Sequence, residues 1–143
     1  MSKQYEKVCD LAHLESFAKD VLADIGEEGV LLLRGTLASG KTAFVQAIAK
    51  ILDIKESISS PTFSILNEYD GRLFHYDIYQ CGTEGFLKSG LIEKLDLSGY
   101  HIIEWGEGEF EALLHHFGIG YSTIDITTEL TKRRYKVNIH AYA

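Results

Sequence analysis

Apolar residues recur at helical spacing in the first part of the chain. They fall on one face of a helix that Asp10 can cap and Gly26 ends: Leu11, Leu14, Phe17, Ala18, Val21, Leu22 and Ile25. Residues 30–34 form a short apolar run that is typical of a buried strand, and helical spacing returns over residues 41–52. The pattern predicts that the chain opens with a helix, which a strand and a second helix follow.

The second half alternates between apolar and polar residues. Segments 63–69 and 72–79 are rich in β-prone residues and flank Asp70-Gly71, a strong signal for a two-residue hairpin turn. Residues 100–105 form a short apolar run suited to a buried parallel strand. Segments 122–127 and 135–140 alternate as strands do, and residues 129–134 join them.

Two further helices are predicted between these strands. One runs from about residue 84 to 95, although Gly85 and Gly90 disfavour a helix. Its inward residues are Phe86, Leu87, Leu91, Ile92 and Leu95. A short helix spans roughly 108–116. The elements together predict an α/β fold, with parallel central strands, antiparallel hairpins and helices on both faces of a mixed sheet. At 143 residues, the chain has the length of a single domain, residues 1–143.

A glycine-containing loop lies between the first predicted strand and the helix at 41–52. Residues 35–42 read Gly-Thr-Leu-Ala-Ser-Gly-Lys-Thr and fit the phosphate-binding pattern G-x-x-x-x-G-K-[ST]. The backbone N–H groups of such a loop and the following helix N-terminus form an anion cradle. A glycine-rich turn with a chance lysine is the alternative, but the flanking strand and helix favour a nucleotide site. Its residues are Thr36, Leu37, Ala38, Ser39, Gly40, Lys41, Thr42 and Ala43, with Lys41 on the β/γ-phosphates and the Thr42 hydroxyl on Mg²⁺.

Two acidic residues close apolar strands. Asp77 and Glu104 each end such a segment, and α/β sheets bind their ligands at the carboxyl ends of strands. One of them can hold Mg²⁺, directly or through water, while the other holds or orients the attacking water. The sequence does not assign these two roles, and a solvated acid at each strand end is the alternative.

Composition narrows the class of protein. Hydrophobic residues make up 45% of the chain and charged residues 24%, and no run approaches the roughly 18 apolar residues that a membrane helix needs. The N-terminus lacks the apolar core of a signal peptide, so we expect a cytoplasmic protein in which Cys9 and Cys81 stay reduced. The net charge of −7 opposes a free-standing nucleic-acid binder. Any RNA is expected to be held by a partner.

Several other residues have two interpretations. Trp105 either lies near the nucleotide or packs in the core. His75 and His101 lie within predicted strands, where hydrogen-bonded structural histidines are commoner than catalytic bases. Residues 132–134, Lys-Arg-Arg, could dock RNA or an acidic partner, although a solvated hairpin turn is the simpler interpretation.

These motifs together resemble the bacterial TsaE (YjeE) family of small P-loop ATPases in tRNA threonylcarbamoyladenosine biosynthesis. The resemblance covers nearly the whole chain and keeps the family's order and spacing. The matching pieces are residues 35–42, Ser60-Pro61-Thr62-Phe63, Asn67-Glu68-Tyr69, His75-Tyr76-Asp77-Ile78-Tyr79 and Ile103-Glu104-Trp105.

The resemblance implies an ATPase that acts with the TsaB and TsaD proteins, which transfer threonylcarbamoyl to the adenosine beside the anticodon. It implies that the equivalents of Lys41 and Thr42 bind phosphate and Mg²⁺, and that those of Asp77 and Glu104 belong to the metal and hydrolysis site. The loop of Ser60, Pro61, Thr62 and Phe63 is expected to behave like a switch near the nucleotide. Intrinsic hydrolysis is expected to be slow.

The chain departs from the family pattern at several positions. The family usually reads Gly-Asp-Leu-Gly-Ala-Gly-Lys-Thr-Thr, and Thr36, Ala38, Ser39 and Ala43 replace four of those residues. The Cβ of Ala38 restricts positive φ, which a glycine at that position would allow. Gly106 stands where the family tends to have proline, which is expected to loosen that turn.

A small-molecule kinase is the alternative function. Such kinases usually clamp the transferring phosphoryl group with arginines of a lid. The arginines here are Arg34, Arg72, Arg133 and Arg134, and none lies between positions 73 and 132, where a lid would be inserted. A third interpretation, a nucleotide-sensing adaptor without catalysis, applies if Asp77 and Glu104 are only structural.

Overall fold

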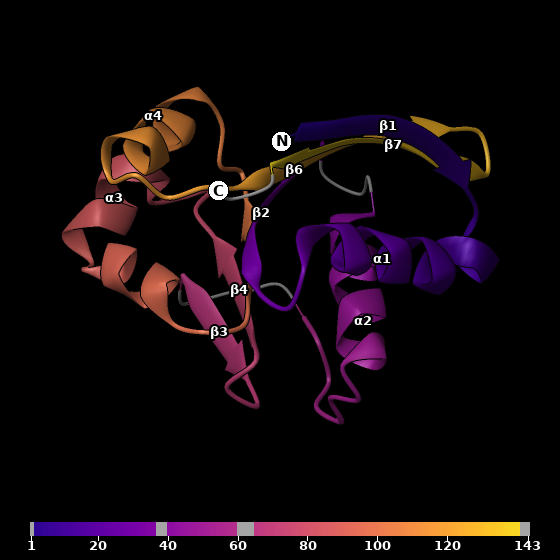
Figure 1. Ribbon diagram of the computed structural model, residues 1–143, viewed down its shortest axis with the longest axis horizontal. Coiled ribbons are helices and arrows are strands. Elements are labelled where there is room, and N and C mark those ends of the chain that lie inside the picture. Colours follow the sequence, from indigo (N-terminus) through magenta and orange to yellow (C-terminus); the bar gives the residue numbers. More distant parts are fainter. Residues whose placement is uncertain (1, 37–39, 60–64, 141–143) are drawn as a thin grey trace.

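The computed structural model describes residues 2–36, 40–59 and 65–140 of the chain. These residues form one mixed sheet with helices on both faces (Figure 1). The strands are β1 (Ser2–Cys9), β2 (Gly29–Arg34), β3 (Leu66–Tyr69), β4 (Leu73–Asp77), β5 (Tyr100–Glu104), β6 (Ser122–Glu129) and β7 (Lys132–His140). The helices are α1 (Leu11–Ile25), α2 (Lys41–Ile51), α3 (Gly82–Lys88), the 3₁₀ helix η1 (Leu91–Asp96) and α4 (Gly108–His116).

The sheet has the order β1-β7-β6-β2-β5-β4-β3. Its four central strands, β6, β2, β5 and β4, are parallel to one another. The antiparallel strands lie outside them, with β3 on one edge and β7 and β1 on the other. This arrangement confirms the predicted combination of parallel central strands and antiparallel hairpins.

Side chains of the central strands alternate between two hydrophobic cores. In β2, Leu31 and Leu33 join the core beneath α1 and α2, whereas Val30 and Leu32 join the core beneath α3 and α4. Figure 1 shows these two pairs of helices on opposite sides of the sheet. The two cores explain why β2 reads as a continuous apolar run, since both of its faces are covered.

The first helix follows the predicted pattern with one exception. The side chain of Asp10 accepts a hydrogen bond from the backbone N–H of His13 at 3.2 Å and caps α1. The apolar stripe is buried from Leu14 to Leu22. Leu11 is 78% exposed, so its predicted packing on the sheet is wrong, because the packed part of the helix begins one turn later.

Two predictions about the elements are wrong. The chain opens with β1 rather than with a helix, and this strand lies at the edge of the sheet, where polar residues are favoured and little apolar alternation develops. The helix predicted over residues 84–95 is two helices, α3 and η1. Gly90 separates them with a φ of 74°, a value that a residue with a side chain rarely adopts, and Leu87 is exposed.

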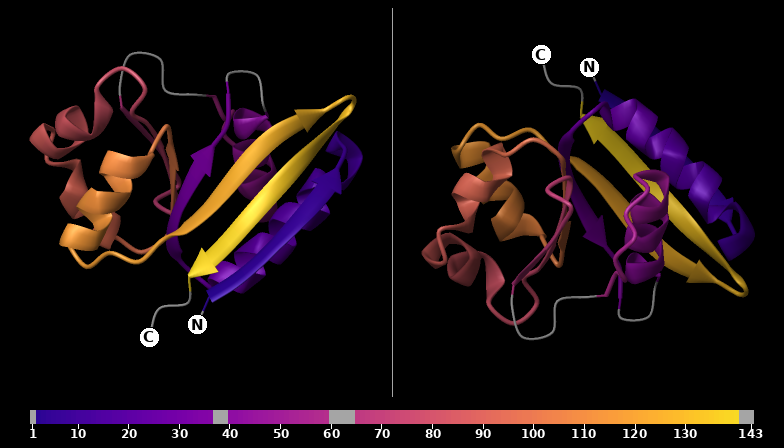
Figure 2. Two further views of the ribbon diagram at one scale, coloured as in Figure 1. Left: turned by 90° about the horizontal axis from the view of Figure 1, so that it is seen from above. Right: turned by 90° about the horizontal axis from the view of Figure 1, so that it is seen from below.

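The β6–β7 hairpin is longer than predicted. Residues 132–134 belong to β7 rather than to the connection, and only Leu130 and Thr131 separate the two strands. Figure 2 shows β6, β7 and β1 as neighbouring strands above α1 and α2. Because side chains alternate along a strand, Arg133 and Arg134 of β7 lie on opposite faces of the sheet.

A buried polar network joins β4 to β5. The backbone carbonyl of Leu97 accepts a hydrogen bond from Nε2 of His101 at 2.9 Å, which leaves Nδ1 of the same ring to accept from the Tyr76 hydroxyl at 2.7 Å. Burial lowers the pKa of His101. The interpretation of His101 as a structural histidine is therefore confirmed.

Within the described ranges, no helix has the length and apolar character that crossing a membrane requires.

Candidate functional site

The loop after β2 ends in a helix N-terminus that is suited to an anion. Gly40 is the N-cap of α2 and has a φ of 105°, which requires glycine, and among the described residues no side chain caps this helix. The first turn of α2 contains no acidic residue. Backbone N–H groups at such an end carry partial positive charge and bind phosphate. The predicted site residues Leu37, Ala38 and Ser39 lie outside the described part of the chain.

Lys41 is buried at the start of α2, with only 6% of its surface exposed. Its Nζ donates a hydrogen bond to the carbonyl of Gly35 at 2.9 Å and lies 3.8 Å from Oε1 of Glu104. The same ammonium lies 3.5 Å from the centre of the Trp105 ring. Lys41 therefore contacts both the residue after β2 and the two residues at and after the end of β5.

Burial and neighbouring charges act in opposite directions on Lys41. Desolvation lowers the pKa of its ammonium, while the carboxylates of Glu104, Asp77 and Glu107 raise it, with desolvation the larger effect. A phosphate group beside Lys41 would add negative charge and would favour the charged ammonium. The electrostatics of the lysine thus fit an anionic ligand.

Asp77 and Glu104 lie side by side at the carboxyl ends of two parallel strands. They are register partners in the β4–β5 pair, and alternation places both on the sheet face that α2 covers. Oδ1 of Asp77 accepts a hydrogen bond from the backbone N–H of Tyr79 at 2.9 Å. The structure therefore brings the two predicted acids together with Lys41.

Glu104 is held by His75, a histidine for which the sequence favours a structural role. Oε2 of Glu104 lies 2.5 Å from Nε2 of His75, and both side chains are almost fully buried. His75 lies two residues before Asp77 and therefore on the same strand face, which is the sequence signal that could have placed it at the site. His75 fixes the orientation of the Glu104 carboxylate toward Lys41.

Trp105 follows Glu104 in an uncommon backbone conformation. Its φ is 70°, a left-handed value that is rare for a residue with a large side chain. The ring contacts Tyr79, with 4.7 Å between ring centres, and covers the ammonium of Lys41. It also packs against the core beneath α3 and α4, as the core interpretation of Trp105 predicts, and its place near a nucleotide stays a prediction.

The remaining predicted residues of the site differ in their positions. Thr42 is half-buried in the first turn of α2, and Thr36 is exposed. Ala43 packs against the core beneath α1 and α2. Gly106 is buried, and a Cβ there would lie 3.1 Å from Phe110, so the turn after Trp105 is filled by neighbouring side chains and not loosely packed.

The switch-like loop of Ser60, Pro61, Thr62 and Phe63 lies outside the described residues. The stretch that leads into it is held at two points. The carbonyl of Ser59 accepts hydrogen bonds from the Tyr69 hydroxyl at 3.3 Å and from Nδ2 of Asn67 at 3.4 Å. Nε2 of Gln46 in α2 donates to the carbonyl of Ile58 at 3.3 Å. Both β3 and the phosphate-loop helix therefore contact this stretch.

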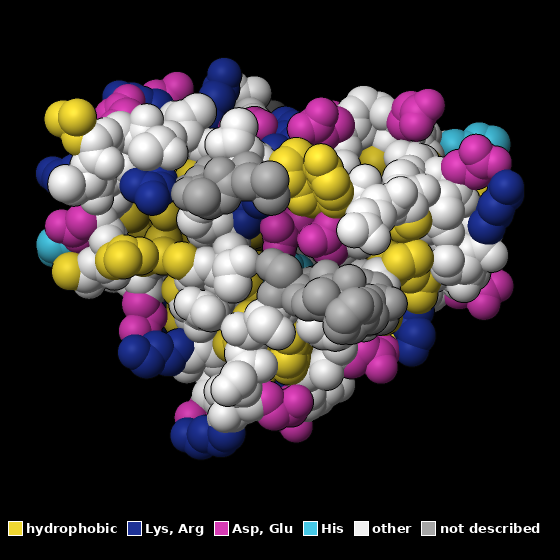
Figure 3. All heavy atoms as spheres, turned by 180° about the vertical axis from the view of Figure 1, so that it is seen from behind, with side chains coloured by type: hydrophobic (Ala, Val, Ile, Leu, Met, Phe, Trp, Pro, Cys, Tyr) yellow, Lys and Arg dark blue, Asp and Glu magenta, His cyan; other side chains and the backbone are white. Residues whose placement is uncertain are grey.

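The acidic residues fit Mg²⁺ that is bound together with a nucleotide. Within the described ranges, no three or more histidine, cysteine or acidic side chains are arranged to hold a metal ion by themselves. Mg²⁺ commonly uses one or two carboxylates together with substrate phosphates and water. Thr42, Asp77 and Glu104 carry oxygen atoms of the kind that such a site uses, and the two acids are neighbours at the ends of β4 and β5. Acidic and hydrophobic side chains gather around a hollow at the centre of one face of the molecule (Figure 3).

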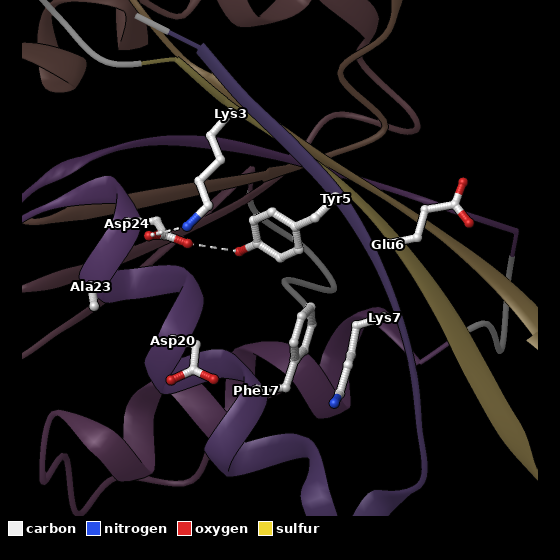
Figure 4. Close-up of a pocket in the computed structure, with 8 residues that line it drawn as sticks. All are labelled: Lys3, Tyr5, Glu6, Lys7, Phe17, Asp20, Ala23 and Asp24. Atoms are coloured by element: carbon white, nitrogen blue, oxygen red, sulfur yellow. Dashed lines mark hydrogen bonds and ion pairs between the residues drawn. The ribbon is translucent and has the colours of Figure 1, made fainter.

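A separate cavity of about 440 Å³ lies between β1 and α1. Three of its polar groups are engaged with one another, since Asp24 accepts hydrogen bonds from Lys3 and from the Tyr5 hydroxyl, each at 3.1 Å (Figure 4). Neither the phosphate loop nor the strand-end acids line it. We therefore assign the chemistry of this protein to the site around Lys41.

Several known proteins are similar to this chain. Residues 8–136 match the family model "Threonylcarbamoyl adenosine biosynthesis protein TsaE". The tRNA threonylcarbamoyladenosine biosynthesis protein TsaE of Treponema pallidum (strain Nichols) is 45% identical over 91 residues, which cover 61% of this chain and 67% of that protein. The protein of the same name from Bacillus subtilis (strain 168) is 40% identical over 79 residues, which cover 53% of this chain and 49% of that protein.

A third relative with this name, from Aquifex aeolicus (strain VF5), is 50% identical over 56 residues, which cover 36% of this chain and 42% of that protein. The chain thus matches less than two thirds of the length of two of these three relatives. Among solved structures, the crystal structure of Bacillus subtilis YdiB has a TM-score of 0.69 at 23% identity, and the match covers 99% of this chain and 88% of that one. This likeness confirms the fold.

Proposed function

The chain belongs to the TsaE family of threonylcarbamoyl adenosine biosynthesis proteins, and from this premise we propose that it is a Mg²⁺-dependent P-loop ATPase that supports threonylcarbamoylation of tRNA. One observation carries the proposal. Lys41 of the phosphate-loop helix, Asp77 of β4 and Glu104 of β5 meet at the carboxyl edge of the parallel strands. A lysine next to two strand-end acids is the arrangement that P-loop ATPases need.

Each residue of the site has a proposed role. Lys41 and the N–H groups at the start of α2 bind the phosphates of ATP, and Thr42 and Asp77 hold Mg²⁺. When bound, Mg²⁺ would neutralise the negative charge that develops on the phosphoryl group during its transfer. Glu104 orients the attacking water, because His75 holds its carboxylate at 2.5 Å and burial keeps it in one place. Trp105 shields the Lys41 ammonium from solvent.

We propose that ATP hydrolysis drives a conformational change in partner proteins. By family resemblance these partners are TsaB and TsaD, and the reaction that they carry out takes place on tRNA in the cytoplasm. The net charge of −7 supports indirect contact with tRNA, through the partners, because direct binding needs a basic surface. Slow intrinsic hydrolysis fits this role, since the partners would set when the ATPase turns over.

The ion pairs of the arginines favour an ATPase over a small-molecule kinase. Three of the four arginines pair with carboxylates on their own or neighbouring elements. Arg34 pairs with Glu111 and Asp125, Arg72 with Asp70, and Arg134 with Glu129 and Glu6, at distances of 2.7–2.9 Å. None of these three extends over the loop as the arginine of a kinase lid would.

Three substitutions test the proposal. Lys41→Ala is expected to abolish ATP binding. Glu104→Gln is expected to keep ATP binding and to lower kcat by about 100-fold, the range for loss of a general base. Asp77→Asn is expected to raise the Mg²⁺ concentration needed for half-maximal hydrolysis. Calorimetry with ATP and a phosphate-release assay over a Mg²⁺ series measure all three effects.

Glu109→Gln is the matched control, because this exposed acid of α4 lies outside the site and its removal should leave hydrolysis unchanged. If the parent chain bound ATP but released no phosphate from it, the nucleotide-sensing adaptor would replace the ATPase. Parent rates of hydrolysis in both Glu104→Gln and Asp77→Asn would show that these two acids are only structural. If phosphate appeared on the hydroxyl of an added small molecule in place of free phosphate, the small-molecule kinase would replace the ATPase.

A further inference from the structure

We propose that Arg133 of β7 is a second cationic group at the phosphate loop and binds the α-phosphate of the nucleotide. The inference rests on the proposed function, since it assigns one more contact to the same nucleotide. Arg133 stands in a basic segment for which the sequence alone favours a solvated turn, and the fold moves it into a strand beside the loop.

The alternation of β7 directs Arg133 toward the helices. Tyr135, Val137 and Ile139 of β7 are buried in the core beneath α1 and α2. Arg133 precedes this series by two residues, so its side chain lies on the same face, at the end of that core. The ring of Tyr135 is 6.0 Å from that of Phe44, one turn into α2. Arg133 therefore lies where α2 begins.

The contact with the loop itself is close. A Cβ added at Gly40 would lie 3.7 Å from Nε and 3.9 Å from Cγ of Arg133, so the side chain of Arg133 packs against the backbone of the N-cap residue. Gly40 immediately precedes Lys41, the phosphate-binding lysine. The guanidinium is thus carried to the residue around which the anion cradle is built.

Charge at this position calls for an anion. The start of α2 carries the positive end of the helix dipole, and its first turn contains no acidic residue. Lys41, which also faces the Glu104 carboxylate, adds a second positive charge, and Arg133 adds a third. A polyphosphate is attracted to this concentration of positive charge, and a guanidinium binds phosphate oxygens with two parallel hydrogen bonds.

The geometry also indicates which phosphate Arg133 contacts. The Lys41 side chain extends toward β5, where it meets Glu104 and Trp105. Arg133 approaches from β7, on the other side of β2 in the sheet. Hydrolysis takes place beside Glu104, so the terminal phosphate must lie on the β5 side and the nucleoside on the opposite one. Arg133 is therefore placed at the α-phosphate, which ADP and ATP share.

The test measures affinity separately from turnover in the full-length protein. Arg133→Ala is expected to raise the Kd of ADP and of ATP by a similar factor of about tenfold, the loss of one charge-assisted hydrogen-bonding group. It is expected to leave kcat at saturating ATP within about twofold of the parent, because a contact made equally in the ground state and transition state does not change kcat. Arg133→Lys should recover part of the affinity, since it keeps the charge and loses the planar fork.

Arg134→Ala is the matched control. It is the next residue in β7, it points to the other face of the sheet, and it pairs with Glu129 and Glu6, so nucleotide affinity should stay at the parent value. Parent-like Kd values in Arg133→Ala would overturn the inference, as would a fall in kcat at unchanged Kd. A lowered Tm of the nucleotide-free protein that Arg133→Lys restores in parallel with affinity would show a role in folding and would also overturn it.

Failure of this inference is separable from failure of the proposed function. If Lys41→Ala abolishes ATP binding while Arg133→Ala binds ADP and ATP as the parent does, the nucleotide site stands and only the role of Arg133 is wrong. If Lys41→Ala also binds ATP as the parent does, the phosphate-loop assignment itself fails.

Discussion

Lys41 illustrates how single side chains define this site. A lysine ammonium is seldom as buried as this one, and here it is stabilised by a carbonyl, a carboxylate and the face of an indole ring. A nucleotide whose phosphates bound Lys41 would change these three contacts.

The indole ring of Trp105 provides a way to observe this change. Trp105 is the only tryptophan of the chain, and its ring lies 3.5 Å from the Lys41 ammonium. Adding ADP or ATP is expected to shift the intensity and wavelength of its fluorescence emission in a saturable way, because Lys41 moves from the ring to the phosphates. A fluorescence titration measures this, with calorimetry giving the Kd independently.

Lys41→Ala serves as the control for the titration, since it removes both the phosphate contact and the cation beneath the ring, and its emission should not respond to nucleotide. Constant emission in the parent at nucleotide concentrations where calorimetry shows full binding would mean that Trp105 and Lys41 keep their contact. Lys41 would then not move from the ring to the phosphates, and its contact with Trp105 would persist in the nucleotide-bound protein.

At the scale of elements, the site depends on how the chain enters and leaves the parallel strands. Gly99 leads into β5 with a φ of 125°, and a Cβ there would lie 2.7 Å from the carbonyl oxygen of Arg72. That same oxygen accepts a hydrogen bond from the backbone N–H of Tyr100 at 2.9 Å. Only glycine allows β5 to approach β4 so closely at this end, and the register of these strands places Asp77 beside Glu104 at the other end.

Gly99→Ala is expected to lower the free energy of unfolding by more than about 2 kcal/mol, because it adds a clash with backbone to an unfavourable φ. Gly26→Ala is the matched variant. Gly26 has a φ of 108° but open space around its Cα, so the loss there should be about 1 kcal/mol. Urea unfolding of both variants measures the difference, and equal losses would show that the contact with Arg72 carries no weight.

Most of the elements could be predicted from the sequence because burial on two faces leaves a clear pattern. The apolar run of β2 and β5, the helical stripe of α1 and the Asp70-Gly71 turn all follow from local rules. The edge strand β1 could not be predicted, because one side of an edge strand has no neighbour and its side chains are mostly polar. Gly90 disfavours a helix already in the sequence, but the apolar spacing continues across it and therefore does not indicate two separate helices.

At the scale of the whole molecule, the site lies where separate parts of the fold converge. The loop after β2, the ends of β4 and β5, and the start of β7 are far apart in sequence and meet around the N-terminus of α2. The phosphate loop and the two strand-end acids could be predicted, because each has a local signature. The positions of His75 beside Glu104 and of Arg133 beside Gly40 could not, because they depend on which residues the strand register brings together.

Coupling of ATP hydrolysis to tRNA modification is the property that distinguishes the proposed ATPase from a nucleotide-binding adaptor. A reconstituted reaction tests it by supplying TsaB, TsaD, tRNA, ATP and the threonylcarbamoyl donor, and by following tRNA modification over many turnovers with the parent chain, with Glu104→Gln, or with neither. We predict sustained modification only with the parent, because Glu104→Gln is expected to bind ATP but to hydrolyse it about 100-fold more slowly. Equal modification in the absence of the chain, or with Glu104→Gln in place of the parent, would contradict this coupling.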